Sequence, residues 1–117
     1  MARLSTHVLD TSRGIPARGV SITLHHLRGD HRELVASAST NTDGRTDHPL
    51  IDAERLETGI YELVFRAGDY FRAAGQTMTT PPFLEDIVVR FGVSDAEGTY
   101  HVPLLLSPYG YSTYRGS

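Results

Sequence analysis

The chain has 117 residues, of which 39% are hydrophobic and 21% charged, and its formal net charge is −3. This length suits one domain covering residues 1–117, and the composition is typical of a globular protein rather than of a disordered one. The small acidic excess argues against a nucleic-acid or acidic-membrane partner, because phosphate binding usually shows as a basic excess.

Short alternating segments predict strands in the first half of the chain. Residues 4–9 are the first candidate. In residues 20–25, Val20, Ile22 and Leu24 alternate with polar side chains, and this period of two is typical of a half-buried strand. Residues 33–39 are a further candidate.

The second half contains four more segments of this kind. Residues 61–66 alternate in the same way, and residues 87–93 are rich in β-branched side chains, which favour strands. Residues 100–106 and 109–114 complete the series. Because proline has no N–H to donate, Pro103 predicts either an edge strand or an interrupted ladder.

One segment departs from the strand pattern. Residues 69–74 predict a short helix, with Asp69 as its N-cap and Gly75 as its C-terminal stop. Turn signals at residues 13–16, 28–30, 43–44, 58–59 and 97–98 separate the strands at short, regular intervals. Together these elements predict an all-β sandwich or barrel.

The sequence contains no cysteine. Disulfides, thiolate metal sites and a cysteine nucleophile are therefore excluded. The first residues, MARLSTH, lack the apolar run of a secretory signal, and no segment approaches the ~20 apolar residues of a membrane span. We therefore expect a cytoplasmic protein.

The histidines divide into two groups. Two of the six, His7 and His101, sit inside otherwise apolar or hydroxylic strands, where a hydrogen-bonded structural histidine remains the simple alternative to a catalytic one. We expect the other four to be solvated surface residues: His25, His26, His31 and His48.

Arg45 follows the predicted turn at residues 43–44. It is either a solvated arginine paired with the neighbouring Asp43 or Asp47, or a bidentate donor for an anionic or carbonyl-rich ligand. Residues 107–117 carry three tyrosines and continue the strand-like alternation, which indicates an interface or a binding groove.

Other reaction classes find little support in the sequence. It has no Gly-x-Ser-x-Gly elbow, no phosphate-binding loop and no His-Glu-x-x-His helix. A three-histidine metal site stays open on counts alone, although no two histidines show ligand spacing on one element.

These segments together resemble the transthyretin-like family, and more closely its branch of 5-hydroxyisourate hydrolases. Residues 5–11 (STHVLDT) and 14–17 (GIPA) match the opening motif of that branch, and residues 42–45 (TDGR) match its middle motif. Residues 101–108 (HVPLLLSP) and 114–117 (YRGS) match its closing motifs. The last is the most specific, because the hormone-carrier branch lacks it and has no histidine where His101 falls.

The resemblance implies a sandwich of two four-stranded antiparallel sheets, with one short helix after the fifth strand. It also implies a homotetramer in which edge strands extend the sheets across a dimer. Two dimers would face each other around a channel, with the active sites at the dimer–dimer interface.

The activity implied by the resemblance is hydrolysis of 5-hydroxyisourate to 2-oxo-4-hydroxy-4-carboxy-5-ureidoimidazoline in urate degradation, a part of purine metabolism. Catalytic roles carry over to His7, Arg45 and His101, with His101 as the water-activating base and His7 as its partner or proton donor. Substrate binding carries over to His7, Arg45, Tyr114 and Ser117. The implied scheme uses no metal and no cofactor.

Two other functions stay open. The first is a carrier that binds a small aromatic ligand in the central channel, and the second is a sandwich that only mediates association. The polar set of His7, Arg45, His101 and Tyr114 favours the hydrolase, since a carrier for an apolar aromatic ligand would favour an apolar channel.

Overall fold

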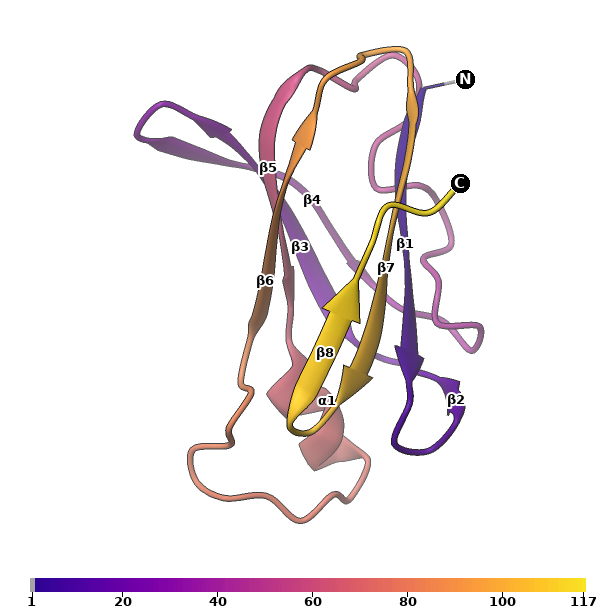
Figure 1. The fold of residues 1–117 in the computed structure, drawn as a ribbon, viewed down its shortest axis with the longest axis vertical. Coiled ribbons are helices and arrows are strands. Elements are labelled where there is room, and N and C mark those ends of the chain that lie inside the picture. Colours follow the sequence, from indigo (N-terminus) through magenta and orange to yellow (C-terminus); the bar gives the residue numbers. More distant parts are fainter. Residues whose placement is uncertain (1) are drawn as a thin grey trace.

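Two four-stranded sheets face each other in the computed structural model, which describes residues 2–117 (Figure 1). Sheet A has the strand order β2-β1-β7-β8, and sheet B has the order β4-β3-β5-β6. The bounds are β1 Arg3–Asp10, β2 Ile15–Pro16, β3 Ser21–Arg28, β4 His31–Ser39, β5 Gly59–Phe65, α1 Ala67–Ala73, β6 Ile87–Val93, β7 Thr99–Ser107 and β8 Gly110–Thr113.

The predicted sandwich of two four-stranded sheets, with a short helix after the fifth strand, is confirmed. One pairing differs from the antiparallel expectation, because β1 and β7 run parallel at the centre of sheet A. The two strands are far apart in the sequence, and a parallel pair needs a long crossover of this kind. The other pairings are antiparallel.

Alternation along β1 decides what faces the core. Leu4, Thr6 and Val8 are buried, whereas Ser5 and His7 are half-buried on the opposite face of sheet A. Side chains in a strand point to opposite faces in turn, so the apolar residues bury area and the polar ones line an outer surface. The largest fully buried side chains, Tyr61, Phe65 and Phe71, come from β5 and α1.

Three local expectations are corrected. The helix begins after Arg66 rather than after Asp69, which lies in its first turn, and the N–H of Gly68 donates to the carbonyl of Glu85. Strand β2 forms within the segment expected to be a turn. His26 is only 4% exposed, because its ring stacks on Tyr61 with the ring centres 4.2 Å apart.

Pro103 lies in an inner strand of sheet A, so its expected edge position is wrong. The alternative expectation, an interrupted ladder, is confirmed. The β7–β8 pairing begins at Leu104, opposite Thr113, and the next pairing on that side of β7 is the bridge between His101 and Gly116. Pro103 therefore occupies the gap between these two stretches of pairing.

A buried carboxylate holds the end of β1 against the helix. Asp10 accepts hydrogen bonds from the hydroxyls of Ser12 and Tyr70 and from the Arg13 guanidinium. Burial alone would raise the pKa of Asp10, but the hydrogen bonds from Ser12, Tyr70 and Arg13 outweigh it and lower that pKa. Folding is therefore stabilised above the ordinary Asp pKa, and this contribution is lost as the pH falls through the lowered value.

The helix and the loop that follows it close one end of the sandwich, and the β3–β4 hairpin projects at the other end (Figure 1). No helix within residues 2–117 has both the length and the apolar character that a membrane crossing requires.

Candidate active site

The outer face of sheet A brings together two histidines that are 94 positions apart in the sequence. His7 and His101 are both half-buried, and they lie on neighbouring parallel strands. The register pairs Ser5 with His101 and His7 with Pro103. The two imidazoles are therefore diagonal neighbours on one face, a separation that side chains of this size span.

Arg45 reaches the same face from the loop between β4 and β5. Its backbone forms an antiparallel bridge with His7, and the N–H of Val8 donates to the carbonyl of Gly44 over 2.8 Å. The imidazole Nε2 of His7 lies 2.8 Å from the carbonyl oxygen of Asp43. A carbonyl only accepts, so this nitrogen carries the proton and donates it, which leaves Nδ1 as the second nitrogen of His7.

The turn that supplies Arg45 is organised by Asn41. The side-chain oxygen of Asn41 accepts from the N–H groups of Asp43 and Arg45, and its backbone N–H donates to the carbonyl of Arg45 over 2.7 Å. Gly44 has φ +77°, and an added Cβ would overlap the carbonyl oxygen of Val8. This position requires glycine, because the turn packs directly against the β1 backbone.

His101 is held by a side chain of β1. Its Nδ1 lies 2.9 Å from the hydroxyl of Ser5. Burial lowers the pKa of His101, and the positive charges of Arg45, His7 and Arg3 lower it further. A neutral imidazole with a lowered pKa can take up a proton at neutral pH, which is the requirement for a general base.

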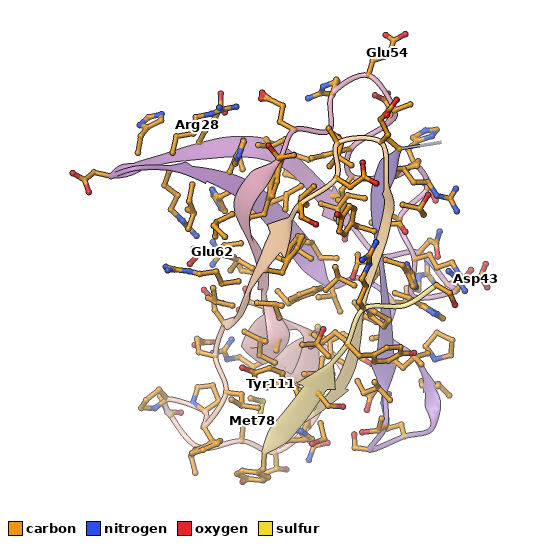
Figure 2. All side chains as sticks on the ribbon, turned by 45° about the horizontal axis from the view of Figure 1, so that its top comes forward. Arg28, Asp43, Glu54, Glu62, Met78 and Tyr111 are labelled. Carbon is orange, nitrogen blue, oxygen red and sulfur yellow. The ribbon has the colours of Figure 1, made fainter. Side chains whose placement is uncertain are left out.

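The C-terminal segment contacts His101 through Gly116. The Gly116 N–H donates to the His101 carbonyl over 2.7 Å, and a Cβ at Gly116 would lie 2.7 Å from the ring carbon Cδ2 of His101. Ser117, the next residue, is exposed. In Figure 2 the end of this segment lies on the same side of the molecule as Asp43.

Tyr114 lies away from the contact between Gly116 and His101. Its side chain is 59% exposed, and it lines a hollow of about 230 Å³ with residues of β6 and β7 that include Val89 and Tyr100. Arg115 places its guanidinium over the Tyr100 ring, 4.2 Å from the ring centre. The structure therefore brings His7, Arg45 and His101 together and adds the tail beside His101, whereas the expected contact of Tyr114 with substrate stays a prediction.

The cluster is accessible to solvent, since His7 and His101 are half-buried and Arg45 is exposed. Two surface hollows of about 460 Å³ each lie elsewhere, one beside His26 and Tyr61 and the other along β4 and residues 46–50. Within residues 2–117, no group of three or more His, Cys, Asp or Glu side chains has the arrangement of a metal site.

Four residues at the site were absent from the sequence-based set: Arg3, Ser5, Asn41 and Gly116. Alternation within the predicted strand 4–9 puts Ser5 on the same face as His7, whereas Arg3 lies just before that predicted strand. Their proximity to His101 depends on the parallel pairing of β1 with β7, which local patterns do not predict. Asn41 and Gly116 had weaker signals, namely an Asx residue before a turn and the glycine of the terminal motif.

The sequence of this chain is similar to those of one known protein family. The model of the HIUase/Transthyretin family matches residues 4–116. 5-Hydroxyisourate hydrolase 2 of Rhizobium meliloti is 60% identical over 98% of this chain and 96% of its own length. The 5-hydroxyisourate hydrolase of Pseudomonas aeruginosa is 52% identical over 100% of this chain and 93% of its own length.

Two solved structures share the fold. The 5-hydroxyisourate hydrolase of Klebsiella pneumoniae has a TM-score of 0.82 and 36% identity, and the match covers both chains completely. An (S)-allantoin synthase has a TM-score of 0.93 and 42% identity over 99% of this chain. This chain spans 44% of the length of that synthase.

Proposed function

The chain belongs to the HIUase/Transthyretin family, and from this premise we infer that it hydrolyses 5-hydroxyisourate to 2-oxo-4-hydroxy-4-carboxy-5-ureidoimidazoline in urate degradation. Relatives named 5-hydroxyisourate hydrolase match it over nearly the full length of both chains. The observation that carries the inference is the convergence of His101, His7 and Arg45 on one face of sheet A, with the pKa of His101 lowered by burial and by the neighbouring positive charges.

The reaction opens a cyclic amide, and each step requires a group that this face provides. His101 takes the proton of the water that attacks a ring carbonyl, because its neutral form predominates at neutral pH. Arg45 donates to the polar ring and stabilises the negative charge that develops on the carbonyl oxygen. The C–N bond then breaks, and the leaving nitrogen takes up a proton.

His7 is the proton donor in this scheme. Its Nε2–H is engaged by the carbonyl of Asp43, so the proton that it gives to the leaving nitrogen comes from Nδ1. In this scheme His7 therefore carries a proton on both ring nitrogens before the C–N bond breaks. After the step His7 is neutral and His101 holds the proton taken from water, so His101 releases a proton to solvent and His7 takes one up before the next turnover. The base and the proton donor of the scheme are both side chains, and the scheme includes no metal and no cofactor.

The C-terminal segment completes the site. Tyr114 closes over the substrate and hydrogen-bonds to it, and Ser117 positions groups through its hydroxyl or its terminal carboxylate. The hydrogen bond between Gly116 and His101 supports this role, since it holds the last residues beside the catalytic base. Together, His7, Arg45, Tyr114 and Ser117 form the binding set.

The open face of sheet A supports a homotetramer with active sites at the dimer–dimer interface. A hydrolytic site gains from a second wall that limits bulk water around the developing charge, and a symmetric partner facing sheet A would supply one. Edge strands β6 and β8 would join two subunits into a dimer, and the exposed Tyr111 on β8 supports this edge as a contact. The absence of cysteine supports a cytoplasmic location.

The function is tested by following 5-hydroxyisourate that urate oxidase generates in situ. Purified protein should accelerate its disappearance catalytically, at enzyme concentrations far below that of the substrate. Decay at the rate seen in buffer would overturn the proposal. Removal of only one equivalent per binding site would also overturn it, and would indicate a carrier.

A further inference from the structure

Among residues 2–117, Ser5 is the only side chain that forms a hydrogen bond with the ring of His101. It lies directly across the β1–β7 pair from that histidine, and its hydroxyl is 2.9 Å from Nδ1. Both side chains are half-buried on the outer face of sheet A, so the hydrogen bond is partly shielded from solvent.

A neutral imidazole has one N–H and one lone pair, and its partners decide which nitrogen carries which. At His101, Ser5 engages Nδ1, and no residue in the range 2–117 forms a hydrogen bond with Nε2. Nε2 is therefore the nitrogen available to a water molecule. It can act as a base only if it holds the lone pair, which requires the proton to be on Nδ1.

A serine hydroxyl suits this task because it accepts from Nδ1–H in both protonation states of the ring. It remains in place when Nε2 gains a proton, so the hydrogen bond need not rearrange during the reaction. A carboxylate in its place would favour the charged imidazole and oppose the effect of Arg45, His7 and Arg3 on His101. A neutral acceptor orients the ring without adding charge.

His7 provides the contrast, since it is held through its other nitrogen. Its Nε2–H donates to the carbonyl of Asp43, so Nδ1 is the nitrogen that this bond does not engage. The two rings are thus fixed through opposite nitrogens, each by a neutral oxygen acceptor. Proton transfer is therefore left to Nε2 in His101 and to Nδ1 in His7.

We propose that Ser5 is a positioning residue that accepts the Nδ1–H of His101 and so keeps the Nε2 lone pair directed at the attacking water. The role in catalysis rests on the proposed hydrolysis of 5-hydroxyisourate, whereas the tautomer of His101 is a property of the protein itself. The two are therefore measured separately.

The tautomer is tested by ¹⁵N NMR of the full-length protein labelled at histidine, at a pH where His101 is neutral. The signals of the His101 ring should show the proton on Nδ1 in the wild type and in Ser5→Thr. In Ser5→Ala they should move toward a mixture of tautomers. A proton on Nε2 in the wild type would overturn the proposal even if the enzyme is fully active, and so would an unchanged tautomer in Ser5→Ala.

Kinetics provide the second readout. Ser5→Ala should lower kcat about tenfold, equivalent to about 1.4 kcal/mol in the barrier, with KM little changed, because the hydroxyl acts on the base rather than on the substrate. Ser5→Thr should recover most of the loss, since it restores an acceptor. Ser37→Ala, an exposed serine on β4 in sheet B, is the matched control and should keep the wild-type rate. A wild-type kcat in Ser5→Ala would refute the role in catalysis.

Discussion

The surroundings of His101 suit this residue to the role of general base that we propose for it. A strand histidine is most often structural, and its position in the sequence gave only a weak indication of function. Burial lowers the pKa of His101, the charges of Arg45, His7 and Arg3 lower it further, and the Ser5 hydroxyl lies 2.9 Å from its Nδ1. In the proposed mechanism, catalysis therefore depends on the neighbours of His101 as much as on its imidazole.

The effect of Arg3 on the pKa of His101 can be tested by substitution. Its positive charge lowers the pKa of His101, together with burial, Arg45 and His7. A base with a lowered pKa stays active as the pH falls, until the pH passes that value. Arg3→Gln removes one of the charges and should raise the pKa of His101, so the acidic limb of the kcat/KM profile should move to higher pH.

The control for this prediction is Arg66→Gln, which removes the same charge from an exposed position at the start of α1. Its pH profile should match that of the wild type. An acidic limb that moves to lower pH in Arg3→Gln, or does not move at all, would show that this limb does not report the titration of His101.

At the scale of elements, the turn at residues 41–45 does the most for the site. This turn lets the Asp43 carbonyl accept a hydrogen bond from His7, and it brings Arg45 beside β1. The side chain of Asn41 accepts a hydrogen bond from the backbone N–H of Asp43 in the turn. The Asp-Gly signal predicted a turn here, and the structure confirms it. Its docking against β1 was not predictable locally, because it depends on backbone contacts between segments more than 30 residues apart.

Gly44→Ala tests that docking. The positive φ of Gly44 alone costs an L-residue about 1–2 kcal/mol, and the added Cβ would also overlap the carbonyl oxygen of Val8. We expect a loss of roughly 2 kcal/mol or more in the free energy of unfolding. We also expect a fall in kcat/KM of about tenfold or more, because Arg45 and the partner of His7 both shift. Urea denaturation and steady-state kinetics measure the two effects.

Gly29→Ala is the matched control. Gly29 also has a positive φ, 61°, but it has open space around it in the turn between β3 and β4. This variant should lose only the backbone contribution and keep its activity. Equal activity of the Gly44→Ala variant and the wild type would contradict the role given to the turn.

The strands themselves were largely predictable, since β1, β3, β5 and β7 alternate between core and outer face. The features that local sequence patterns did not predict depend on contacts with residues that are distant in the sequence. The parallel pairing of β1 with β7 follows from the global topology, and His26 is buried because Tyr61 on the neighbouring strand stacks on it. The start of the helix was shifted by the bond from Gly68 to the distant Glu85.

For the whole molecule, the main feature is a polar cluster on the outer face of sheet A, in which His7 and His101 are half-buried and Arg45 is exposed. The family resemblance predicted the residues His7, Arg45 and His101, and the fold brings them together. In the proposed homotetramer, partner subunits would also contribute to the positions of Tyr114 and Ser117 relative to substrate. We therefore propose that residues 114–117 link assembly to catalysis.

Removal of residues 114–117 tests this link. The deletion loses the Gly116 hydrogen bond to His101 and the packing of Arg115 on Tyr100, so we expect kcat/KM to fall roughly tenfold or more. Light scattering after gel filtration measures the tetramer content of the same samples. A loss of turnover in proportion to lost tetramer would indicate action through assembly, whereas a loss within intact tetramers would indicate contact with substrate.

Ser117→Ala serves as the conservative comparison, because it removes one hydroxyl and keeps the terminal carboxylate and the Gly116 bond. It should lose less activity than the deletion and retain the wild-type assembly. Full activity of the deletion variant would contradict any role for the tail.

The most direct test of the account is the turnover number of His101→Asn in assembled protein, measured with 5-hydroxyisourate generated in situ. Asparagine keeps a polar side chain at this position but cannot take up the proton. Since a positioned general base contributes typically a hundredfold or more, kcat should fall by about that factor, with the oligomeric state and the urea midpoint unchanged. A kcat close to the wild-type value in equally assembled protein would show that His101 is not the base and would contradict the mechanism.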